Sequence, residues 1–148
     1  MPTFNLRDDV FELFTDRFDV SEIVAKCIIR YQGKEKGEEP KRDYWVRIST
    51  SEVGSPQVAF AMTPEPDASP SVYESFGLVF VQVFAPMSEE DSFHNGDLIA
   101  KAARDIFRRV ETPSGVTFRN ARFNELDNDG KFYRWNVKVE YEYTERKG

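Results

Sequence analysis

Hydrophobic and polar residues alternate along this chain with two different periods, and the longer period marks two helices. Between Leu6 and Phe18, apolar residues recur every three to four positions with charged residues between them, which predicts an amphipathic helix. A second apolar stripe follows the polar start Ser92–Asp97 and runs from Leu98 to Val110, with lysine and arginine opposite. Each segment is expected to pack through one face.

The shorter period predicts strands in the middle and at the end of the chain. YWVRIS, which begins at Tyr44, fits a first strand, and GLVFVQVFAP, residues 77–86, fits a central strand covered on both faces. The C-terminal third predicts a hairpin, in which VTFRNARF and FYRWNVKVEYEY flank a turn over residues 127–130. Gly130 can take the positive φ that such a turn needs. Alternate residues from Tyr133 to Tyr143 are apolar, so one face of the last strand is expected to pack.

Three segments between these elements are less regular. Ser21 followed by Glu22 suits the start of another helix, whereas the run IVAKCII after it suits a strand equally well. Residues 33–42, GKEKGEEPKR, contain two glycines, a proline and seven charges, and they predict an exposed charged loop. Residues 50–76 are rich in proline, serine and threonine and are expected to form a long functional loop, in which Val58–Met62 fits a short strand.

Length and composition then bound the architecture. The chain has 148 residues, of which 40% are hydrophobic and 14% aromatic, and this suits one globular domain over residues 1–148 with a single core. The predicted elements make an α+β fold, with a mainly antiparallel or mixed sheet of about four to six strands. Two or three helices are expected to pack on this sheet, and a C-terminal β-hairpin is expected to complete it.

The charge balance narrows the class of partner. Lysine and arginine number 20 against 26 acidic residues, so the net charge is −6, which argues against nucleic acid as a sequence-specific partner. No stretch approaches the roughly 18 apolar residues of a membrane span, and the N-terminal MPTFNLRDD lacks the apolar core of a secretion signal. We therefore expect no membrane partner and a protein that stays in the cytoplasm where it is made.

Residues able to carry chemistry are few. The one histidine, His94, lies between Asp91 and Asp97, where an oriented general base is conceivable, but a capping or surface role is commoner at a helix start. Cys27, the one cysteine, has apolar neighbours and is expected to be an inert core thiol. One histidine and one cysteine are too few ligands for zinc, and the turn DNDG, residues 127–130, lacks the spacing of a calcium loop. We expect no catalytic residue, no metal site and no cofactor.

The run from GLVFVQVFAP through SEEDSFHNGD and LIAKAARDIFRR to the C-terminal hairpin resembles the tail-terminator, or minor tail, proteins of long-tailed bacteriophages. The positions that carry the resemblance are Phe84, Pro86, Gly96 and Trp135, within a match that extends from about Tyr44 to Tyr143. The resemblance implies a structural virion protein and no enzyme. It implies a ring, a hexamer, that caps the finished tail tube, ends its growth and gives the surface that joins the head. The implied partners are further copies of the chain, the tail tube protein and the head–tail connector protein.

In a closed ring, each subunit has two different patches, and each patch binds the other kind of patch on a neighbouring subunit. The candidates for the subunit interface are apolar residues of the long loop region and of the second helix start: Val58, Phe60, Met62, Tyr73, Phe76 and Phe93. The loop residues among them suit the core of the monomer equally well. Two other functions also fit the sequence. One is another head–tail joining or completion protein, and the other is a small-ligand-binding or enzymatic α+β module with His94 or Asp97 at the mouth of an aromatic pocket.

Overall fold

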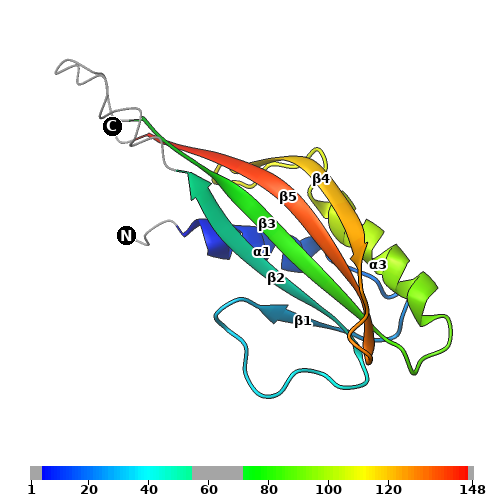
Figure 1. Cartoon of the computed structure of the whole chain (residues 1–148). Coiled ribbons are helices and arrows are strands. Elements are labelled where there is room, and N and C mark those ends of the chain that lie inside the picture. The colour runs from blue at the N-terminus through cyan, green and yellow to red at the C-terminus, as the bar shows by residue number, and fades with distance from the viewer. Residues whose placement is uncertain (1–4, 55–71, 147–148) are drawn as a thin grey trace, which may run out of the picture.

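The computed structural model, described for residues 5–54 and 72–146, is one mixed sheet with two helices packed on the same side (Figure 1). Five strands make up the sheet, in the order β1-β2-β3-β5-β4. The elements are α1 (Leu6–Arg17), β1 (Cys27–Tyr31), β2 (Tyr44–Gly54), β3 (Val72–Pro86), α3 (Ser92–Ile106), β4 (Thr117–Leu126) and β5 (Phe132–Arg146). The α+β class and the C-terminal hairpin, β4–β5, are confirmed.

The first two strands run parallel, and this explains the segments on either side of them. Residues 27–31 form strand β1, so the ambiguous stretch after Ser21 contains a strand and no second helix. A parallel pair needs a connection of about a dozen residues that returns the chain to the end where it started. Residues 32–43 make this return without a helix or a strand, and most of residues 33–42 are exposed.

The core lies between the sheet and the helices. In β3 the alternate residues Val79, Val81 and Val83 are fully enclosed, because they point to the side where α1 and α3 lie. Phe14 of α1 and Phe107 after α3 stack with ring centroids 6.2 Å apart, which joins the two helices over the sheet. Each fully buried large apolar side chain contributes about 1.5–3 kcal/mol to folding. This single layer therefore holds the domain together.

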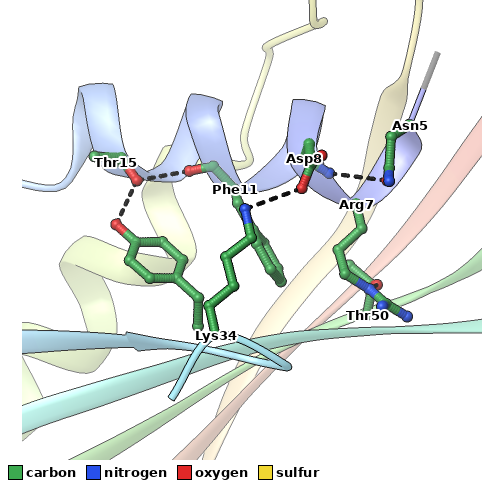
Figure 2. Close-up of polar contacts among 8 residues, drawn as sticks. Asn5, Arg7, Asp8, Phe11, Thr15, Lys34 and Thr50 are labelled. Atoms are coloured by element: carbon green, nitrogen blue, oxygen red, sulfur yellow. Dashed lines mark hydrogen bonds and ion pairs between the residues drawn. The ribbon is translucent and has the colours of Figure 1, made fainter. Parts of the chain in front are cut away.

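Polar contacts fix the position of α1 at the rim of the core (Figure 2). Asn5 caps the helix, because its side-chain oxygen accepts the amide hydrogen bond of Asp8 at 3.3 Å. The Asp8 carboxylate in turn lies 3.2 Å from Nζ of Lys34 in the loop after β1. Further along the helix, the hydroxyls of Thr15 and Tyr31 are 2.6 Å apart. The contacts join both ends of α1 to the β1 edge of the sheet.

The predicted end of the second helix is too late. The helix α3 stops at Ile106, before the predicted Val110, and Arg109 adopts a positive φ of 55° that no α-helix accommodates. The buried apolar stripe nevertheless extends past the helix, because Phe107, one residue after its end, is also buried. No helix among residues 5–54 and 72–146 is long and apolar enough to cross a membrane.

The prediction that the central strand is covered on both faces is wrong for one face. Both helices lie on the valine side of β3, and Phe80 and Phe84 on the other side stay partly exposed (Figure 1). We call this side of the sheet, which neither α1 nor α3 covers, the open face. Because an apolar strand run looks alike whether one or two layers cover it, the sequence alone does not separate the two cases.

The prediction that residues 50–76 form one loop is also wrong at both ends. The strand β2 continues to Gly54, and β3 already begins at Val72. Pairing between strands explains this extension. Thr50 lies opposite Val79 and Glu52 opposite Gly77, and β3 thereby satisfies the backbone hydrogen bonds of these polar residues. Residues 55–71 between them, with the predicted short strand Val58–Met62, lie outside the described residues.

Candidate interaction surface

Two of the six predicted interface residues are exposed aromatic side chains. Phe76 is 40% exposed near the start of β3, and Phe93 is 44% exposed in the first turn of α3. The backbone of Tyr73 forms part of β3. The remaining three lie outside the described residues: Val58, Phe60 and Met62. A partner can therefore reach at least Phe76 and Phe93.

The Phe93 ring packs on aromatic residues of β5, and its other side is exposed to solvent. Its ring meets that of Tyr133 edge-on at a centroid distance of 5.2 Å and that of Trp135 at 5.4 Å. One turn further along α3, Gly96 lies directly on Trp135. An aromatic ring fixed in this way offers a large contact area and loses little conformational entropy when a partner binds.

More exposed hydrophobic side chains lie at the same end of the sheet as Phe93. Met87 follows the end of β3 and is 37% exposed, and Leu126 ends β4 and is 36% exposed. The amide of Met87 donates to the carbonyl of Lys131 at 2.9 Å, which ties this end to the hairpin turn. Leu126 lies opposite Arg134 and so points to the open face, whereas Phe93 packs on the helix side, so the two are exposed on different faces at this end. Phe76 lies about 30 Å away along β3, at the opposite end of the sheet.

An aromatic row crosses the open face near this α3 end. The rings of Trp45 and Phe84 are stacked at a centroid distance of 3.8 Å, and Phe132 meets both edge-on. On the other side of Trp45, the guanidinium of Arg30 lies 5.9 Å from the ring centroid and donates to the carbonyl of Glu38 at 2.8 Å. The charged loop is thereby tied over the row, and a hollow of about 540 Å³ remains between loop and rings. Trp45 stays only 3% exposed.

A β-bulge in β4 decides which side chains reach the open face. Arg119 lies opposite Glu140 and Arg122 opposite Lys138, so two residues of β4 face one residue of β5 between these pairs. Asn120 in the bulge has a φ of 54°, a conformation that asparagine tolerates better than most residues. Without the extra residue, positions 119 and 122 would point to opposite faces. With it, both arginines lie on the open face.

The same bulge keeps the core intact. Phe118 and Phe123 both point to the helix side, where Phe118 meets Phe107 at 5.1 Å and Phe123 lies under the guanidinium of Arg104 at 5.2 Å. The bulge was not predicted from the sequence. A signal was present in FRNARF, where Phe-Arg is followed, after two residues, by Arg-Phe. In a strand without a bulge, each face would then carry one phenylalanine and one arginine, so the apolar and basic residues would not be separated.

A hollow of about 470 Å³ opens beside the bulge on the open face. Arg119 contacts the carboxylates of Glu140 and Glu142 at 3.7 and 3.9 Å. Neither Arg122 nor Lys138 forms an ion pair with another described residue. We call this hollow, with its excess of positive charge, the basic hollow. Its lining side chains include Phe76, Leu78, Arg119, Arg122, Lys138 and Glu140.

The residues proposed for a ligand pocket lie apart. His94 is exposed on α3, and the Asp97 carboxylate is 3.1 Å from Nζ of Lys101 on the same helix. The aromatic row with Trp45 and Phe84 is on the other face of the sheet. An aromatic pocket with His94 or Asp97 at its mouth is therefore not formed among the described residues.

The contacts of the other candidates, Cys27 and the turn over residues 127–130, are those of residues that stabilise the fold. Cys27 is half-buried against the core, and burial raises the pKa of its thiol to about 12. In the hairpin turn, a carboxylate oxygen of Asp129 accepts the amides of Lys131 and Phe132 at 2.9 and 2.7 Å, and Gly130 takes the predicted positive φ. No group of three or more histidine, cysteine, aspartate or glutamate residues in the described part of the chain is arranged to hold a metal ion.

Comparison with known proteins gives the fold and no family. No family model matches the chain, and no curated protein matches it in sequence. Among solved structures, 11 chains match. One of them superposes with a TM-score of 0.60 at 14% sequence identity, and the match covers 95% of each chain. At this identity the likeness shows that the two chains share a fold over nearly their whole length.

Proposed function

We propose that this chain is a structural subunit of a bacteriophage tail, which assembles head to tail into a closed ring and caps the tail tube. The observation that carries the proposal is the position of Phe76 and Phe93. These exposed aromatic side chains lie toward opposite ends of one sheet, in different surroundings. A closed ring needs two such unlike patches on each subunit, because every contact joins one patch to the other on the next copy.

The resemblance from the central strand to the C-terminal hairpin supports the same proposal. Its positions Phe84 and Pro86 lie at the end of β3, and Gly96 and Trp135 form the contact that sets α3 on the sheet. In this proposal the ring ends the growth of the tail tube and offers its other side to the head–tail connector. The complete particle, made in the host cytoplasm, holds the ring within its tail.

Solution mass and electron microscopy test the assembly. We expect light scattering to find a closed oligomer, a hexamer, whose negatively stained images show a central hole. Phe93→Ser and Phe76→Ser should each shift the protein to the monomer, because each removes the centre of one patch. His94→Ala is the matched control, since it changes an exposed residue next to Phe93 and should leave the ring intact.

A mixture of the two phenylalanine variants separates head-to-tail from symmetric contacts. Each variant keeps the patch that the other has lost, so the mixture should form heterodimers and no ring. Addition of the unaltered chain to purified, uncapped tail tubes should place a ring at the tube end. A chain that stays monomeric at all concentrations and also fails to bind the tubes would contradict the proposal.

A further inference from the structure

The open face carries positive charge in an acidic chain. Eight charged side chains of described strand residues point to it, six of them basic and two acidic, although the whole chain has a net charge of −6. The charge outside these eight side chains is therefore strongly negative, and part of it, on Glu35, Glu38 and Glu39, belongs to the loop over the aromatic row. The eight are Arg30, Arg47, Arg119, Arg122, Arg134, Lys138, Glu140 and Glu142.

Internal contacts satisfy only part of this positive charge. Arg47 pairs with Glu35, Arg30 binds loop carbonyls, and Arg134 donates to the carbonyl of Asp127 at 2.9 Å. The basic hollow is different, because Arg122 and Lys138 face each other across β4 and β5. Two like charges directly opposite each other destabilise a sheet unless an anion lies near them. The hollow is thus the part of the open face best suited to receive a carboxylate.

The acidic turn between β3 and α3, which we define as Glu89, Glu90 and Asp91, is the matching feature. All three residues are exposed, and none forms an ion pair with a described residue. Two basic residues, Lys26 and Arg42, line a hollow together with Glu89 and Glu90, and Lys26 pairs with Asp43. The turn lies at the α3 end of the sheet, where the chain passes from β3 to α3 (Figure 1).

We propose that the basic hollow of one copy receives the acidic turn of the next copy around the ring. The inference deepens the proposed function and rests on its head-to-tail assembly. The two hydrophobic anchors already lie at these places, since Phe76 lines the hollow and Phe93 follows the turn. Complementary charges around such anchors fix the register of a contact and suppress wrong pairings. The hollow lies on the open face between Phe76 and the pair Arg122 and Lys138, well apart from the turn at the α3 end, and a contact that closes a ring joins two such separate sites.

Charge reversal tests the contact. Arg122→Glu with Lys138→Glu makes the hollow acidic, and Glu89→Lys with Glu90→Lys makes the turn basic. Each double variant alone should assemble at least about tenfold more weakly than the unaltered chain, because like charges then meet. The control, Lys36→Glu with Lys41→Glu in the exposed loop, changes the net charge as much as the hollow variant and should assemble normally.

The decisive measurement mixes the hollow variant with the turn variant. Every contact in an alternating ring then joins opposite charges, so mixing equal amounts should restore closed rings with even subunit numbers. Combining all four substitutions in one chain should restore assembly as well. Thermal melts of each variant check folding, and failure of the mixture to assemble while both variants melt normally would overturn the inference.

The outcomes separate this inference from the proposed function. If the unaltered chain forms rings and the charge variants form them equally well, the hollow does not receive the turn, and the ring proposal stands. If the hollow variant forms rings but no longer binds tail tubes, or loses binding to an oligonucleotide probe, the occupant is another molecule and the inference is wrong. If the unaltered chain neither assembles nor binds tubes, the proposed function itself fails.

Discussion

Gly96 of α3 lies so close to Trp135 of β5 that a Cβ atom on the glycine would be 2.3 Å from Cη2 of the indole. The same Cβ would lie 2.9 Å from the Cβ of Ala85. No real side chain fits there, so this glycine determines how closely the helix approaches the sheet. The contact also supports Phe93, whose ring packs against Trp135 one turn earlier.

Gly96→Ala is therefore expected to destabilise the protein by about 1–3 kcal/mol through overpacking. The sign is informative, because the same change in an unhindered helix interior stabilises by about 0.8–1 kcal/mol. Chemical denaturation measures the change, and Lys101→Ala at an exposed position of α3 provides a control that should stay within about 0.5 kcal/mol. A stabilised Gly96→Ala variant would show that the helix can move away at no cost.

The stacked pair Phe14 and Phe107 gives a second prediction. Both side chains are almost fully buried, and together they join α1 to the end of α3. Phe14→Ala should lower the free energy of unfolding by about 3–5 kcal/mol, because it removes apolar burial and leaves a cavity. Urea titration measures this loss. Phe93→Ala, which truncates an exposed phenylalanine, should cost clearly less, and equal losses would contradict the burial pattern.

The sequence predicted most of the core and little of the open face. Helical and strand periods placed Phe14, Val81 and Trp135 correctly, because burial of one face imposes a period on the residues. The open face has no such period. Phe80 and Phe84 interleave with the core valines in one apolar run, which a strand buried on both sides would also show.

The basic hollow could not be predicted because it depends on pairing between distant segments. Arg122 and Lys138 become neighbours only through the register of the hairpin, and Arg119 joins them only through the bulge at Asn120. The net charge of −6 gave no sign of a basic hollow, since a total does not report how charge is distributed over faces. Exposure of Phe93 was predicted as an interface feature, but its anchoring on Trp135 required the position of α3.

Asp129 should make the stability of the hairpin depend on pH. The slight loss of solvent around its carboxyl would raise the pKa, but hydrogen bonds from the amides of Lys131 and Phe132, with Arg134 nearby, outweigh this effect and hold the pKa below its ordinary value of 3.8. The ionised form therefore stabilises the folded state at pH values above about 4 and loses this effect as the pH falls through the lowered pKa.

Asp129→Asn keeps an oxygen that accepts the two amide hydrogen bonds and removes the charge. We expect the variant to be less stable than the unaltered protein at pH 6 and to approach it in stability near about pH 2. Thermal melts over this range measure the difference. A stability gap that stays constant from pH 6 to about pH 2 would contradict the role of the ionised carboxylate.

Cys27 should be an unreactive thiol in the folded protein. Burial raises its pKa from 9.0 to about 12, so the thiolate, which is the nucleophile, is roughly 1000-fold scarcer in the folded state than in the unfolded chain at pH 8. Reaction with a disulfide reagent should accordingly be at least about tenfold slower in buffer than in guanidinium chloride, because the higher nucleophilicity of a thiolate with a raised pKa offsets part of its scarcity. Because the folded state disfavours the thiolate, the free energy of unfolding should be constant below pH 9 and fall as the pH rises above it. Cys27→Ala should remove this alkaline loss, and rapid labelling of the native protein at pH 8 would show that β1 opens at the edge of the sheet.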